Sequence, residues 1–97
     1  MSDRTGQIVL ATAGRDRDGL FCVVGEDREF LLLADGKRRR VSHPKRKKPG
    51  HVTAAGPAEF DHPVIRKLKQ GEPVSDRALR QALATFKGGD HTWQKTI

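Results

Sequence analysis

The sequence predicts a mainly β domain: a small five-stranded barrel over residues 1–53, followed by a C-terminal extension of two short α-helices. In the first half, apolar runs rich in Val, Leu and Ile alternate with glycine-containing polar turns, a pattern typical of successive strands. After a linker at 54–60, apolar residues recur at helical spacing over 61–88. The polar residues 89–97 are expected to form a flexible tail.

Three apolar strands are expected first, over residues 7–12, 20–25 and 29–34. The second and third are almost continuously apolar, which predicts either central strands covered on both faces or a strongly curled sheet whose outer face meets something else. The C-terminal helices are candidates for that cover. Asp35-Gly36 is the strongest hairpin signal in the chain, and it predicts a two-residue turn into a fourth strand at 37–41.

A short fifth strand is expected to close the barrel after the basic segment. Pro44 and Pro49-Gly50 interrupt that segment, and proline cannot donate a hydrogen bond to a strand ladder. We therefore predict a loop over Lys45–Lys48 and the closing strand over 51–53.

Capping residues place two helices after the linker. Asp61 is positioned to cap a first helix that runs to about Gln70, with Pro63 in its first turn and Gly71 after its end. The second helix, expected to end near Lys87, has the same kinds of signal: the cap Ser75, the stop Gly88-Gly89 and the apolar stripe Leu79, Ala82, Leu83 and Phe86.

Positive charge is the most informative chemical feature of the chain. Lys and Arg number 19 against 12 Asp and Glu, which gives a net charge of +7. Eight of the twelve residues from Lys37 to Lys48 are basic, and no carboxylate lies between Asp35 and Glu59. Such density attracts polyphosphate and releases its counterions. The charge balance favours nucleic acid or an anionic membrane surface as the partner.

Several function classes lack the residues they need. The chain has no nucleophile motif, no phosphate-cradling glycine loop before a helix and no HExxH, so we expect neither an enzyme nor a cofactor or small-molecule substrate. No metal site is predicted, because no Cys lies at ligand spacing from any of the histidines, His43, His51, His62 and His91. Cys22 lies in an apolar strand and is expected to be a small buried hydrophobe.

The expected compartment is the cytoplasm. No run approaches the roughly 20 apolar residues of a membrane span, and the polar N-terminus up to Gln7 shows no signal-peptide pattern. A single cysteine, which cannot form an internal disulfide, fits a reducing environment. We therefore expect no membrane partner.

The segment from Gly6 to Val24 resembles the KOW family. The matching elements are Gly6-Gln7-Ile8-Val9, Gly14, the loop 15–18, Gly19 and the strand Leu20–Val24. Two further stretches are similar to small bacterial KOW-containing RNA-binding proteins, which are themselves similar to archaeal and eukaryotic large-subunit ribosomal proteins. These are Ala34-Asp35-Gly36 with the basic residues after it, and Val74-Ser75-Asp76 with Leu79-Arg80-Gln81-Ala82-Leu83.

The resemblance, which covers residues 6–52, implies an SH3-like barrel whose first hairpin and flanking loops contact RNA. It also implies ribosomal RNA as the ligand, a place in a ribonucleoprotein that serves translation, and ribosomal proteins as neighbours. The structural glycines are then Gly6, Gly14, Gly19 and Gly36. Gly14 and Gly19 either let the loop approach an RNA backbone closely or supply positive φ at a tight turn.

The candidate RNA-binding residues are ten basic side chains in three stretches: Arg15 and Arg17; Lys37, Arg38, Arg39 and Arg40; Lys45, Arg46, Lys47 and Lys48. Arg15 and Arg17 would clamp phosphates or stack on unpaired bases, or else they only balance Asp16 and Asp18. For Lys37–Arg40 the alternative is edge-strand charge that prevents aggregation. For Lys45–Lys48 it is a solvated loop or a patch that resembles a targeting signal.

The sequence is also compatible with two other functions. A protein-interaction module would use a groove of the barrel or the apolar stripe of the second helix. A nucleoid-type DNA-binding protein would use the same positive charge on a duplex. Trp93, alone in the polar tail, either stacks on a base or packs on the barrel.

Overall fold

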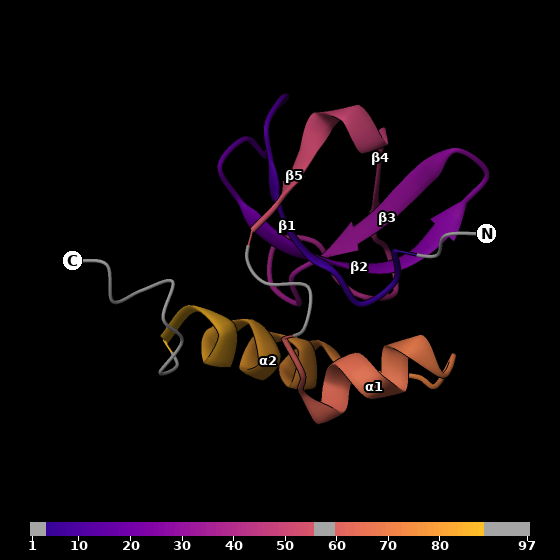
Figure 1. Cartoon of the computed structure of the whole chain (residues 1–97), viewed down its shortest axis with the longest axis vertical. Helices are drawn as coiled ribbons and strands as arrows, with labels where there is room; N and C mark the ends of the chain where they lie inside the picture. The colour runs from indigo at the N-terminus through magenta and orange to yellow at the C-terminus, as the bar shows by residue number, and fades with distance from the viewer. Residues whose placement is uncertain (1–3, 56–59, 89–97) are drawn as a thin grey trace.

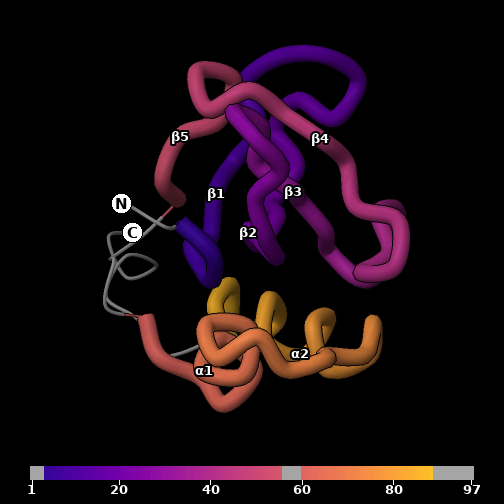
Figure 2. Tube along the Cα trace, turned by 90° about the vertical axis from the view of Figure 1, so that its right-hand side faces the viewer, coloured from indigo at the N-terminus to yellow at the C-terminus, as the bar shows by residue number. Residues whose placement is uncertain are grey.

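The structure of the protein, a computed structural model, describes residues 4–55 and 60–88. In chain order they form β1 (Ile8–Ala11), β2 (Leu20–Asp27), β3 (Phe30–Ala34), β4 (Lys45–Lys47), the 3-10 turn η1 (Pro49–His51), β5 (Val52–Ala54), α1 (Pro63–Lys69) and α2 (Asp76–Gly88). The strands lie on one side of the molecule and both helices lie together on the other (Figures 1 and 2). The predicted tail, with Trp93, and residues 56–59 of the predicted linker lie outside the described residues.

The strands form one antiparallel sheet in the order β4-β3-β2-β1-β5. The fold is therefore mixed, a five-stranded sheet with two helices, and the predicted closed barrel is wrong. β4 and β5 are the two edges of the sheet, and each is only three residues long. Such short edge strands offer little backbone for a further pairing that would close the sheet.

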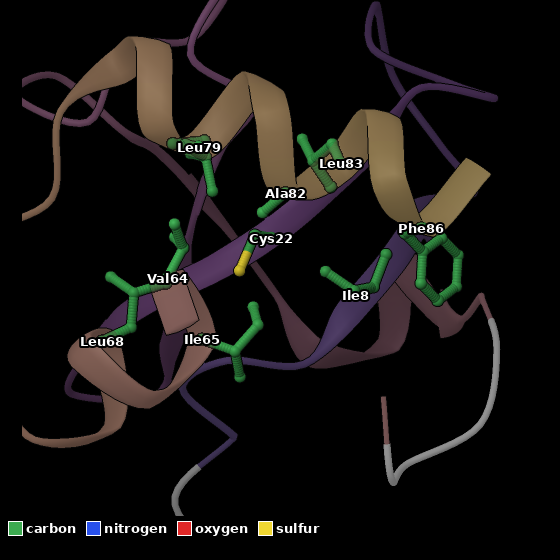
Figure 3. Packing of buried hydrophobic residues seen from close by; sticks show 10 residues of the cluster. Ile8, Cys22, Val64, Ile65, Leu68, Leu79, Ala82, Leu83 and Phe86 are labelled. Atoms are coloured by element: carbon green, nitrogen blue, oxygen red, sulfur yellow. The ribbon is translucent and has the colours of Figure 1, made fainter. Parts of the chain in front are cut away.

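Alternation along the strands divides their apolar side chains between two cores. The face away from the helices holds Val9, Ala11, Phe21, Val23, Leu31 and Leu33. The opposite face holds Ile8, Cys22 and Ala34, which pack with residues of both helices. The prediction that the central strands are covered on both faces, with the helices on one, is confirmed. Figure 3 shows Cys22 lying between side chains of α1 and α2.

Each helix buries the apolar stripe that its sequence predicts. The buried residues are Val64, Ile65 and Leu68 in α1, and Leu79, Ala82, Leu83 and Phe86 in α2 (Figure 3). Helices of 7 and 13 residues are not stable alone. Burial of each large apolar side chain contributes about 1.5–3 kcal/mol, so this shared core holds both helices in place. Within the residues that the structure describes, neither α1 nor α2 has the length and apolar character needed to cross a membrane.

The start of α2 is as predicted, and the start of α1 differs by one residue. Oγ of Ser75 accepts the N–H of Ala78 at 3.1 Å. In α1 the N-cap is His62, whose Nδ1 accepts the N–H of Val64 at 3.2 Å. Asp61, the predicted cap, instead binds Arg66, with 2.6 Å between Oδ2 and Nη2. The carboxylate is thus engaged by a guanidinium and is not at the helix end.

Residues 35–44 form a ten-residue loop, and the predicted fourth strand at 37–41 does not exist. Oδ1 of Asp35 accepts the N–H groups of Lys37 and Arg39, both at 2.9 Å. The N–H of Val41 donates to Oδ1 of Asp76 in α2 at 2.7 Å. Because side-chain carboxylates take these donors, the backbone cannot use them in a strand ladder. Asp35-Gly36 therefore begins a long connection and is not a two-residue hairpin.

The fourth strand lies in the segment predicted to be a loop. β4 pairs with β3 through Leu33↔Lys45 and Leu31↔Lys47, so its two lysines share the face of the sheet on which Leu31 and Leu33 are buried. Lys45 is half-buried and Lys47 is 8% exposed, so their methylene stems can cover that core. β5 lies within one residue of the predicted closing strand, but it pairs with β1 alone among the described strands.

Candidate nucleic-acid interface

A buried carboxylate, Asp16, lies in the loop between β1 and β2 and joins the basic stretches. Asp16 is only 6% exposed, and its Oδ2 accepts a hydrogen bond from Nη2 of Arg39 at 2.9 Å. Burial favours the neutral acid, but the hydrogen bond and charge of Arg39, with the charges of Lys47 and Arg38, outweigh it. The pKa of Asp16 is therefore held below its ordinary value.

Two glycines of the same loop let basic side chains approach the backbone. A Cβ at Gly14 would lie 3.0 Å from Nζ of Lys47, and a Cβ at Gly19 would lie 2.7 Å from Nη2 of Arg38. Gly14 has a positive φ of 82°, whereas Gly19 does not adopt positive φ. Both glycines thus leave room for cations of the protein itself.

The three predicted basic stretches therefore meet around one loop. Arg38 and Arg39 reach it from the 35–44 loop, and Lys47 reaches it from β4. The chain after β4 is held at the same place, because the N–H of Thr12 donates to the carbonyl of His51 at 2.8 Å. Arg15 and Arg17, on either side of Asp16, are exposed.

The structure divides the ten predicted residues by exposure. Lys47 is buried at 8% exposure, and Arg39 and Lys45 are half-buried. Seven are exposed: Arg15, Arg17, Lys37, Arg38, Arg40, Arg46 and Lys48. Arg39 and Lys47 therefore act as internal supports of the surface, and the exposed residues are the ones available to a ligand.

Arg46 is set apart from the other exposed residues. It pairs with Leu32, on the opposite side of β4 from Lys45 and Lys47. Its guanidinium lies 4.9 Å from the centre of the Phe30 ring and 3.3 Å from Oδ2 of Asp27. The remaining six exposed residues are here named the basic surface: Arg15, Arg17, Lys37, Arg38, Arg40 and Lys48.

The 35–44 loop is fixed in position by α2. Besides the bond from Val41 to Asp76, Nη1 of Arg80 donates to the carbonyl of Gly36 at 2.6 Å. Gly36 has φ +77°, and a Cβ there would collide with the carbonyl oxygen of Asp76. The loop approaches the start of α2 in Figure 2. Asp76 and Arg80 of α2 therefore help to hold the site in place. The sequence did not identify them as site residues, and the one signal for them was that Arg80 lies off the apolar stripe of its helix.

The described residues show no metal site. They contain no group of three or more His, Cys, Asp or Glu side chains that could hold an ion. Cys22 is fully buried, as predicted, and burial raises the pKa of its thiol to about 12. It is not a reactive thiolate near neutral pH.

No model of a known protein family matches the chain, and no curated protein matches it.

Proposed function

We propose that the protein binds structured RNA through the basic surface. The six side chains come from three stretches of sequence. Arg38, Arg39 and Lys47, from two of those stretches, contact the loop that carries Arg15 and Arg17. Ammonium and guanidinium groups bind phosphate oxygens, and their release of counterions supplies most of the affinity. Double-stranded RNA is recognised by its shape and its phosphates, which suits a surface of fixed cations.

The observation that carries this proposal is the coupling of Asp16 to Arg39, 2.9 Å apart. If Arg15 and Arg17 only balanced acidic neighbours, Asp16 would be expected to pair with them. Instead its carboxylate binds Arg39 from another loop. The two loop arginines are then available to a ligand.

The KOW resemblance supports a more specific proposal, namely ribosomal RNA as the ligand and association with the ribosome in translation. The residues of the match from Gly6 to Val24 lie on β1, on β2, in the loop between them and just before β1. Arg15 and Arg17 of the basic surface lie in this loop. As part of the same proposal, the open sheet is related to the SH3-like barrel, and the protein is located in the cytoplasm.

Binding to a folded RNA tests the proposal. Arg15→Ala with Arg17→Ala should weaken binding, while Arg66→Ala with Lys67→Ala, which removes the same charge from α1, should not. Equal losses for both pairs, or none for either, would contradict the assignment. A duplex DNA of equal length is the second arm. If it competes as well as RNA, the nucleoid-type function replaces the RNA-binding one.

A further inference from the structure

A groove runs between α2 and the start of β2, beside the basic surface. It consists of two hollows of about 410 and 360 Å³. Leu20, Arg38 and Lys87 line both hollows, which therefore adjoin. We name it the α2 groove. The volume of each hollow is at the small end of the range for ligand sites, roughly 300–1,000 Å³.

The α2 groove combines an apolar floor with a cationic rim. Half-buried Leu20 contributes most of the floor, and the almost fully buried Leu83 and Phe86 line it with the small part of their surface that is exposed. Figure 3 shows Leu83 and Phe86 on the same helix. Lys37, Arg38 and Lys87 contribute positive charge. An apolar floor accepts a flat ring system, and cations at its edge accept the phosphates attached to that ring.

Arg38 connects this groove to the basic surface. Its side chain is 58% exposed, its Cζ lies 5.9 Å from the centre of the Phe21 ring, and it lines both hollows. A guanidinium in this position can bind a phosphate or stack on a base. Two carboxylates, Asp18 and Asp35, also line the groove. Oδ1 of Asp35 is already engaged by the N–H groups of Lys37 and Arg39, and its Oδ2 lies 3.8 Å from Nε of Arg38. A phosphate at Arg38 therefore shares the guanidinium with Asp35.

We propose that the α2 groove takes one unpaired nucleotide of the RNA that lies on the basic surface. The base rests on the apolar floor, and Arg38 and Lys87 hold the flanking phosphates. This inference rests on the proposed function and names the feature of the RNA that is preferred. Unpaired bases are the parts of folded RNA whose rings can leave the stack and enter a protein pocket.

Filling the groove tests the inference without changing charge. Ala84 is exposed on α2 and lines the groove, so Ala84→Leu should occupy space there and keep the helix. Thr85→Leu is the matched control, because Thr85 is exposed on the same helix and does not line either hollow. Lys87→Gln is a second variant that removes a rim charge, with Arg77→Gln as its control.

The probe is an RNA hairpin with one unpaired 2-aminopurine, compared with the same hairpin fully paired. Wild-type protein should bind the unpaired form about tenfold more tightly, within the range of a base-stacking contribution, and should change the 2-aminopurine fluorescence. Ala84→Leu and Lys87→Gln should reduce that preference, while Thr85→Leu and Arg77→Gln keep it. Affinity of Ala84→Leu for the paired hairpin should be unchanged.

Equal affinity of the wild-type protein for both hairpins, with RNA binding otherwise intact, would overturn this inference and leave the proposed function standing. Absence of binding to either hairpin would defeat the proposed function itself. An Ala84→Leu variant that keeps the full preference would also overturn the inference. A third result would overturn the inference as well. If the 2-aminopurine fluorescence did not change, and if the wild-type protein but not Ala84→Leu bound an acidic Glu/Leu peptide, the occupant of the groove would be a protein segment.

Discussion

The carboxylate of Asp16 and the guanidinium of Arg39 form a 2.9 Å ion pair between two loops that are 23 residues apart in the chain. Asp16 is largely shielded from solvent, with 8% of its side chain exposed, and the Arg39 side chain is 32% exposed. Because an isolated charge in such a position is costly, each residue depends on the other. The pair sets the position of the 35–44 loop against the loop between β1 and β2.

Asp16→Asn should therefore weaken both the fold and the binding of RNA. We expect a loss of about 1.5–3 kcal/mol in the free energy of unfolding, as for a hydrogen bond to a charged group. This corresponds to a fall in Tm of several degrees for a domain of this size. RNA affinity should also fall, although the variant is more positively charged. Thermal unfolding and RNA titration check the two effects.

A rise in RNA affinity for Asp16→Asn would contradict this account, because it would mean that Asp16 acts only as an opposing charge. Asp27→Asn provides the comparison. Asp27 also pairs with an arginine, but both side chains of that pair are about half exposed. Exposed pairs contribute little to stability, so the Tm of this variant should stay close to that of the wild type.

Acid should remove the contribution of Asp16 to stability. Its pKa in the folded protein lies below the ordinary value of 3.8, so the unfolded chain binds its proton first as pH falls. The stabilisation is then fully present above about pH 4 and disappears as pH falls through the lower folded pKa. Urea unfolding between pH 2 and 7 should show a smaller acid-dependent loss in Asp16→Asn than in the wild type. Identical profiles would show that this carboxyl does not contribute.

Substitution of Gly36 by any residue with a side chain should destabilise the protein. Its φ of +77° disfavours L-residues, and a Cβ would meet the backbone of Asp76. We expect Gly36→Ala to cost about 1–3 kcal/mol and to loosen the 35–44 loop from α2. Gly50→Ala is the control, because a Cβ at Gly50 meets nothing within 4 Å. Chemical denaturation compares the two; similar midpoints would contradict the contact between the loop and α2.

Local patterns predicted most of the elements, because their causes lie close in the chain. The apolar runs that become β1, β2 and β3, and the stripe and Ser75 cap of α2, need only neighbouring residues. The 35–44 loop could not be predicted in this way. Asp35-Gly36 suits a hairpin or a longer connection, and the choice depends on Asp76, which lies 35 residues from Val41.

The position of β4 and the residues that hold the site in place could not be predicted from the sequence for a related reason. Lys45–Lys47 has low intrinsic strand preference, and its pairing follows from the buried leucines of β3 opposite it. The sequence identified the basic residues of the surface as candidates. It could not show that Arg39 would pair with Asp16 or that Lys47 would be buried, because Asp16 looked like an ordinary loop carboxylate.

The most direct test of the central claim is the salt dependence of RNA binding. If the six residues of the basic surface each neutralise about one phosphate, the slope of log K against log salt should be roughly −4 to −5. Arg15→Ala with Arg17→Ala should make that slope shallower by about 1.5, and Arg66→Ala with Lys67→Ala should leave it unchanged. A wild-type slope near zero, or the same change in both pairs of variants, would contradict the claim that this surface binds RNA.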